Sequence, residues 1–144
     1  MPEQLGFVQG RLIQPPTGAL QWFPQDFWEH EFFVASSIGA DYLELIVERE
    51  TNATNPIWTD SGIDRILELS RRVGLSLPAL CNDFVINHKF FTKKVLDQNT
   101  ALIKRAALLG VENFILPLFE ASDITPDNYL KFLAPLRHLA DTAR

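Results

Sequence analysis

The sequence lacks the features that mark disulfide-bonded, membrane-spanning and secreted proteins. Its single cysteine, Cys81, cannot form an internal disulfide, and a reducing cytoplasm is the usual compartment of such a chain. The apolar run Phe114–Phe119 has six residues, whereas a transmembrane helix needs about 20. The opening Met-Pro-Glu-Gln has neither the basic nor the apolar region of a secretory signal. We therefore expect a cytoplasmic protein with no membrane partner.

The sequence is also short of clustered basic residues and of phosphate-binding loops. It has 13 Lys and Arg against 18 Asp and Glu, which gives a formal charge of −5 at pH 7. Its densest basic groups are only pairs, Arg71-Arg72 and Lys93-Lys94, while a nucleic-acid surface needs a cluster. No G-x-G-x-x-G or G-x-x-x-x-G-K-[ST] motif follows an expected strand. These absences argue against a nucleic-acid partner and favour a small molecule.

What the sequence has is the composition of one folded domain, residues 1–144, and an internal repeat. It is 47% hydrophobic and 22% charged. Gly39, Gly74 and Gly110 lie 35 and 36 residues apart, and each follows an amphipathic stretch and precedes a short apolar run. A glycine just past a helix end can adopt the left-handed conformation that closes the helix. The repeating unit is therefore a helix, a glycine turn and a strand.

The repeat predicts an α/β fold of four consecutive βα units. The expected strands lie near residues 5–9, 41–47, 76–82 and 112–118, and the expected helices near 26–38, 60–73, 93–109 and 126–143. Such units form a parallel sheet with right-handed crossovers, here in the order 1-2-3-4 with helices on one face. The strand-to-helix loops are long, and binding sites of parallel α/β folds lie on these loops.

The candidate binding residues follow the first two expected strands. Arg11 comes two residues after Gln9, and its guanidinium either holds a hydroxyl, carboxylate or phosphate or pairs with a nearby carboxylate. Strand alternation directs Glu44 and Glu48 away from the helices, where a buried acid needs a partner. We therefore expect Arg11 to lie within hydrogen-bonding reach of Glu44, and Glu48 either to contact ligand or to be solvated.

Further candidates follow the later strands. Cys81, Asp83 and His88 lie within eight residues, but they lack the paired ligand spacing of a zinc site. Cys81 suits packing better than nucleophilic chemistry, whereas Asp83 or His88 either contacts substrate or is structural. Glu120 is a further carboxylate after the fourth strand. Trp22 belongs to a group of loop aromatics that either line a pocket or cover the core.

Three segments together resemble the start of the sugar phosphate isomerases/epimerases of the xylose isomerase-like superfamily. They are Gly6-Phe7-Val8-Gln9-Gly10-Arg11-Leu12 with the Pro-rich loop and Trp22-Phe23-Pro24, Trp28-Glu29 with Gly39-Ala40-Asp41-Tyr42-Leu43-Glu44, and Val73 to Asp83 followed by His88. The resemblance implies the amino-terminal half of a (β/α)8 TIM barrel, since eight units need about 250 residues. The family positions that match are Gln9, Arg11, Glu44, Cys81, Asp83 and His88, with roles in shaping the pocket and contacting substrate.

The resemblance also implies a chemistry for the complete protein. Such enzymes bind a divalent cation (Mn, Mg or Zn) through residues of later strands and move a proton between carbons beside a carbonyl, so no metal ligand is assigned in this chain. The alternatives are a non-catalytic half-barrel that binds a sugar or sugar acid, and a phosphodiester-cleaving nuclease of the same superfamily, which the charge of −5 disfavours.

Four strands also leave one face of the sheet without a cover. We expect the inner face, including Phe7 and Ile46, to be open to water, and the isolated chain to self-associate as a two-fold dimer or to need a carboxyl-terminal half. Because the expected metal ligands lie outside it, the isolated chain is expected to be inactive in isomerisation.

Overall fold

The structure is a computed structural model that describes residues 3–19 and 22–144. Its strands are β1 (Gly6–Val8), β2 (Tyr42–Val47), β3 (Ala79–Asn82) and β4 (Asn113–Ile115). Its α-helices are α1 (Trp28–Ser37), α2 (Asp60–Val73), α3 (Phe84–Asn87), α4 (Lys93–Leu108) and α5 (Tyr129–Thr142). Two short 3-10 helices, η1 (Pro56–Trp58) and η2 (Glu120–Ser122), lie in the loops after β2 and β4.

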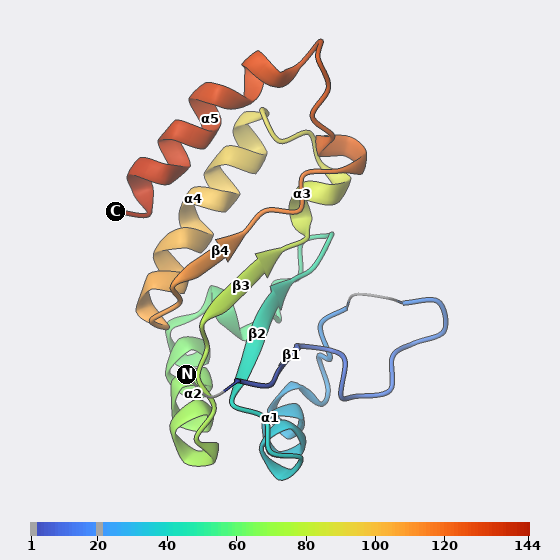
Figure 1. The fold of residues 1–144 in the computed structure, drawn as a ribbon, viewed down its shortest axis with the longest axis vertical. Coiled ribbons are helices and arrows are strands. Elements are labelled where there is room, and N and C mark those ends of the chain that lie inside the picture. The colour runs from blue at the N-terminus through green and yellow to red at the C-terminus, as the bar shows by residue number, and fades with distance from the viewer. Residues whose placement is uncertain (1–2, 20–21) are drawn as a thin grey trace.

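The four strands form one parallel sheet in the order β1-β2-β3-β4 (Figure 1). The α/β class and the strand order predicted from the glycine repeat are therefore confirmed, and the arrangement is consistent with half of a βα barrel. Gly39, Gly74 and Gly110 have φ values of +81°, +76° and +72°, the left-handed conformation expected where a helix turns into the next strand.

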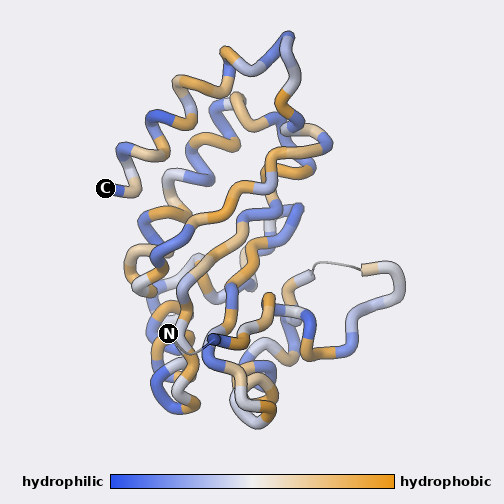
Figure 2. The backbone as a smooth tube through the Cα atoms, viewed as in Figure 1, coloured by the Kyte–Doolittle hydropathy of each residue, from blue (hydrophilic) through white to orange (hydrophobic). Residues whose placement is uncertain are grey.

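The main core lies between the sheet and the helices. Leu43, Leu45 and Val47 point from β2 into a cluster that also contains Ile66 of α2 and Leu102 of α4. This alternation follows from the two-residue period of a strand. In Figure 2 hydrophilic and hydrophobic segments alternate along α4 and α5, as expected for helices with one buried face.

A second core cluster joins α3, α4 and α5 beside the β4 end of the sheet. Phe90 and Phe132 stack with ring centroids 5.2 Å apart, and Phe84, Val95 and Leu139 complete the centre of the cluster. Stacked aromatic pairs add stability beyond the area that they bury. This cluster holds the loop after β3 in place, and that loop carries several of the candidate site residues.

The expectation that Phe7 and Ile46 are open to water is wrong. Phe7 pairs in register with Leu43 and packs against the helix-side core. Paired residues of neighbouring strands point to the same side of a sheet, so Phe7 faces the helices and not the inner face. Ile46 does lie on the inner face, but only 2% of its surface is exposed. It sits on a central strand, opposite Cys81 of β3 in the register.

Candidate functional site

The sheet register defines an inner face, the face opposite the helices. Since Leu43, Leu45 and Val47 point to the helix-side core, Glu44 of β2 points to the other face. Cys81 of β3 pairs with Ile46 and therefore shares this inner face. Asp83 follows two residues later, and its backbone N–H donates to the Val47 carbonyl at 2.9 Å.

Glu44, Cys81 and Asp83 form an acidic cluster on the inner face. The Cys81 thiol donates a hydrogen bond to Asp83 Oδ1 at 3.3 Å. Asp83 is 1% exposed, and within the described part of the chain its second oxygen, Oδ2, has no hydrogen-bond partner. A buried carboxyl oxygen without a partner is costly to the fold. The cluster therefore contains a buried acceptor that no described protein group satisfies.

Burial and mutual repulsion shift the protonation of these three groups. Desolvation raises the pKa of Asp83, although the Cys81 thiol and the charges of Arg49 and Arg11 act in the opposite direction. Burial, and then the charge of Asp83, raises the pKa of Glu44. Burial also raises the pKa of the Cys81 thiol well above its ordinary value, helped by Asp83 and Glu44. The thiol is therefore protonated and not a nucleophile at neutral pH.

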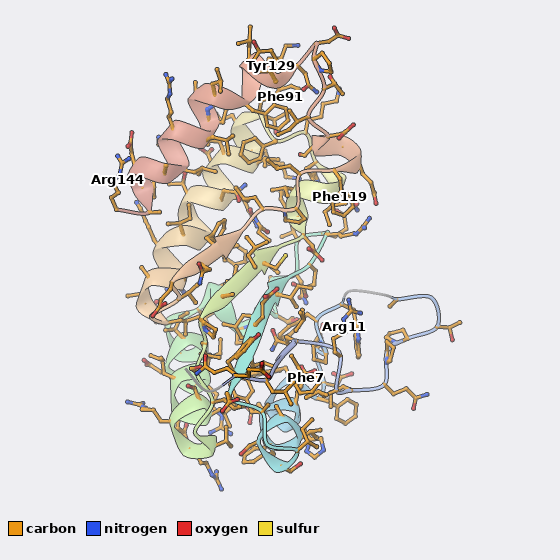
Figure 3. The ribbon with its side chains drawn as sticks, viewed as in Figure 1. Phe7, Arg11, Phe91, Phe119, Tyr129 and Arg144 are labelled. Carbon is orange, nitrogen blue, oxygen red and sulfur yellow. The ribbon has the colours of Figure 1, made fainter. Side chains whose placement is uncertain are left out.

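The predicted pairing of Arg11 with Glu44 is wrong. No hydrogen bond or ion pair joins the two among the described residues, and Arg11 is exposed. The reason is local: Gly10 has φ +85°, and the Arg11 N–H donates to the Val8 carbonyl in a turn, so the strand alternation stops before Arg11. Figure 3 shows Arg11 on the loop that follows β1, at the β1 end of the sheet. Its charge still lowers the pKa of Asp83.

Glu31 of α1 holds this turn, and the sequence did not reveal it. Its carboxylate accepts from the Gly10 N–H at 2.8 and 2.9 Å and from the Leu12 N–H at 3.0 Å, and its side chain is fully buried. Desolvation raises the pKa of Glu31, while these backbone hydrogen bonds lower it. The sequence shows only that Glu31 directly precedes the apolar residues Phe32 and Phe33. Glu31 thus positions the loop that carries Arg11.

Three predicted site residues have structural partners. The Ile46 N–H donates to Gln9 Oε1 at 3.3 Å, and Trp22 Nε1 donates to the Gly10 carbonyl at 2.9 Å. Glu48 accepts hydrogen bonds from two side-chain amides of the following loop, at 2.6 and 3.0 Å, from Asn52 and Asn55. These side chains shape the β1 and β2 loops that border the acidic cluster.

His88 and Glu120 belong to a separate polar cluster at the carboxyl ends of the strands. Arg49 donates two hydrogen bonds to the Glu120 carboxylate at 3.0 and 3.1 Å. His88 stacks on Phe84 with centroids 3.9 Å apart, and its Nε2 lies 3.7 Å from a carboxylate oxygen of Glu50. Arg49 is therefore a further polar residue of this edge that sequence reasoning missed. It links the loops after β2 and β4.

No family model matches this chain, and no curated protein matches it significantly. Within residues 3–19 and 22–144, no three His, Cys, Asp or Glu side chains are grouped so that they could hold a metal ion. Over the same residues, none of the helices is both long and apolar enough to cross a bilayer.

Proposed function

We propose that this chain is the substrate-binding half of a sugar or sugar-phosphate isomerase or epimerase with a (β/α)8 barrel. The observation that carries the proposal is the free Oδ2 of the buried Asp83 beside Glu44. A sugar hydroxyl can donate the hydrogen bond that this oxygen does not receive from the protein. Asp83 follows β3 at the carboxyl edge of the sheet, where parallel α/β folds bind ligands, while Glu44 and Cys81 lie within β2 and β3.

The acidic cluster suits a polyol better than a simple anion. Its two carboxyl groups would repel an anionic group placed directly against them. A hydroxyl, in contrast, donates to a carboxylate and accepts from a protonated carboxyl group, so it fits either protonation state. Arg11 is exposed beside the cluster and carries the cation that a carboxylate or phosphate at the far end of such a substrate needs.

The divalent cation that the sequence resemblance implies is not assigned to these residues. The described side chains do not form a metal-binding group, and no step is derived through a metal. The proposed roles of this chain's residues are to bind and orient the substrate: Asp83 and Glu44 bind hydroxyls, and Arg11 binds the acidic end.

A titration of the 144-residue chain with glucose, fructose and fructose 6-phosphate, followed by backbone amide NMR, tests the proposal. We expect saturable shifts around Asp83 and Glu44, and at least about 10-fold weaker binding in Asp83→Asn, as for the loss of one good hydrogen bond to a charged group. Asp64→Asn, an exposed acid on α2, is the matched control and keeps the wild-type affinity. Arg11→Gln is expected to weaken only the phosphorylated sugar. The absence of any saturable binding, or binding that Asp83→Asn leaves unchanged, contradicts the proposal.

A further inference from the structure

We propose that two copies of this chain associate head to tail, with α5 of each copy seated in a groove beside α1 of the other, and so close an eight-stranded barrel. This inference does not depend on the proposed sugar chemistry. It rests on three observations of the described residues: two open sheet edges, two apolar surfaces, and opposite charges on those surfaces.

The two outer strands leave their edges unpaired at opposite ends of the sheet. Among residues 3–19 and 22–144, β1 pairs only with β2, and β4 pairs only with β3, all in parallel. Open strand edges present unpaired backbone groups that favour pairing with another chain. Because eight parallel strands close a barrel, β1 of one copy placed beside β4 of the other keeps every pair parallel. Two such seams close the barrel without leaving an edge.

The first apolar surface lies on the β1 side. A groove of about 690 Å³ runs between α1 and the loop after β1. Phe27, His30 and Val34 line it from the start and the outer face of α1, and Leu12 and Pro15 line it from the loop. Phe27 is 57% exposed, which is unusual for so large an apolar side chain. We call this surface the α1 groove.

The second apolar surface lies on α5, which Figure 1 shows at the other end of the sheet from α1. Leu130 and Leu133 are one helical turn apart and are 65% and 42% exposed, and Tyr129 beside them is 49% exposed. The opposite face of α5 is already buried through Phe132 and Leu139. We call Tyr129, Leu130 and Leu133 the α5 stripe. An amphipathic helix face of this kind fits an apolar groove.

The charges around the two surfaces are complementary. Residues 26–41 contain four acidic side chains and no Lys or Arg, while residues 129–144 contain three basic side chains and one acidic. Glu31 is buried and Glu29 is bound to Arg65, so Asp26 is the acid that lines the groove. On α5, Arg137 is exposed one turn after Leu133. Opposite charges across an interface favour contact between α5 and the α1 groove of the other copy over contact between the two α5 helices.

The order of the elements agrees with this pairing. α5 follows β4 and α1 follows β1, so a parallel β4–β1 seam brings α5 of one copy next to α1 of its partner. The same seam places Ile115 of β4, which is 37% exposed, at the lumen that both inner faces enclose. The acidic cluster then lies inside a closed barrel, and the site is incomplete in a single copy.

Sedimentation velocity on the 144-residue chain, without ligand, tests the proposal. We expect a dimer at roughly 10–100 μM, and an increase in the dimer dissociation constant of at least about 100-fold in Leu130→Asp and in Phe27→Asp, since each places a charge in an apolar contact. Leu108→Asp, at a leucine that is 58% exposed on α4, is the matched control and remains dimeric. Circular dichroism of the three variants checks that each substitution leaves the fold intact.

Mixing the two monomeric variants tests the head-to-tail geometry. A heterodimer of Leu130→Asp with Phe27→Asp contains one seam in which both surfaces are wild type, so we expect the mixture to regain part of the association that each variant lacks. The proposal is overturned if the wild-type chain is monomeric at about 100 μM, the upper end of the expected range. It is also overturned by a dimer that either variant leaves intact, or by a mixture that remains monomeric. These assays contain no sugar, so a failure to associate is distinguishable from a failure of the sugar titration.

Discussion

The carboxylate of Glu31 on α1 accepts both of its shortest hydrogen bonds from the backbone N–H of Gly10, at 2.8 and 2.9 Å. Gly10 and Glu31 are 21 residues apart, and the contact ties the turn after β1 to the first helix. A carboxylate that gathers successive backbone N–H groups satisfies donors that would otherwise be buried and unpaired. The turn that carries Arg11 therefore depends on Glu31.

Glu31→Ala should lower the free energy of unfolding by roughly 2–4 kcal/mol, because it leaves the Gly10 and Leu12 N–H groups without an acceptor. Urea unfolding followed by circular dichroism measures the loss. Glu29→Ala is the matched control on the same helix. Glu29 is partly exposed and binds Arg65, and an exposed ion pair contributes at most about 1 kcal/mol. Equal losses in the two variants would contradict the role given to Glu31.

Gly10→Ala should be strongly destabilising. A Cβ at Gly10 would lie 2.2 Å from the backbone oxygen of Trp22, and the residue has φ +85°. The left-handed conformation alone costs a residue with a side chain about 1–2 kcal/mol, and the clash with backbone adds to it. Gly39→Ala is the control, since Gly39 has φ +81° but open space around it. We expect the denaturant midpoint to fall further in Gly10→Ala, and a smaller fall than in Gly39→Ala would refute the packing argument.

The strand order and the face of each β2 side chain could be predicted from the sequence because they depend on short, regular patterns. The glycine repeat marks the helix ends, and the two-residue period separates Leu43 from Glu44. The position of Arg11 was predicted wrongly because the alternation of β1 places Phe7 on the helix side and not on the inner face, and because Gly10 ends the strand pattern before Arg11. Arg49 was missed for another reason: its partner Glu120 is 71 residues away, and no local pattern connects two such residues.

The acidic cluster should make the stability of the protein depend on pH. Burial raises the folded-state pKa of Asp83, so its contribution to stability is present below the unfolded pKa and is lost as the pH rises through the folded pKa. The free energy of unfolding of the wild type, minus that of Asp83→Asn, should therefore fall as the pH rises above about 4, where an ordinary unfolded Asp ionises. Urea unfolding at several pH values measures the difference. A difference that grows with pH would contradict the environment described for Asp83.

Cys81 should be unreactive in the folded protein. Its thiol is buried and its pKa is raised, and only the thiolate reacts with a disulfide reagent. We expect labelling at least about 100-fold slower than in 6 M guanidinium chloride, because reaction then needs opening of the structure. A Ser37→Cys variant in a Cys81→Ser background is the control, since Ser37 is exposed. Fast native labelling of Cys81 would show that the inner face is open at this position.

We propose above that the unpaired oxygen of Asp83 accepts a ligand hydroxyl on the inner face. The most direct measurement is the ¹³C NMR resonance of the Asp83 carboxyl group during titration with fructose and fructose 6-phosphate. We expect the Asp83 and Glu44 carboxyl resonances to move together to a saturable end point, while that of the exposed Asp64 stays in place. If a sugar saturates the protein elsewhere while the Asp83 and Glu44 resonances stay unchanged, Asp83 is not the ligand acceptor.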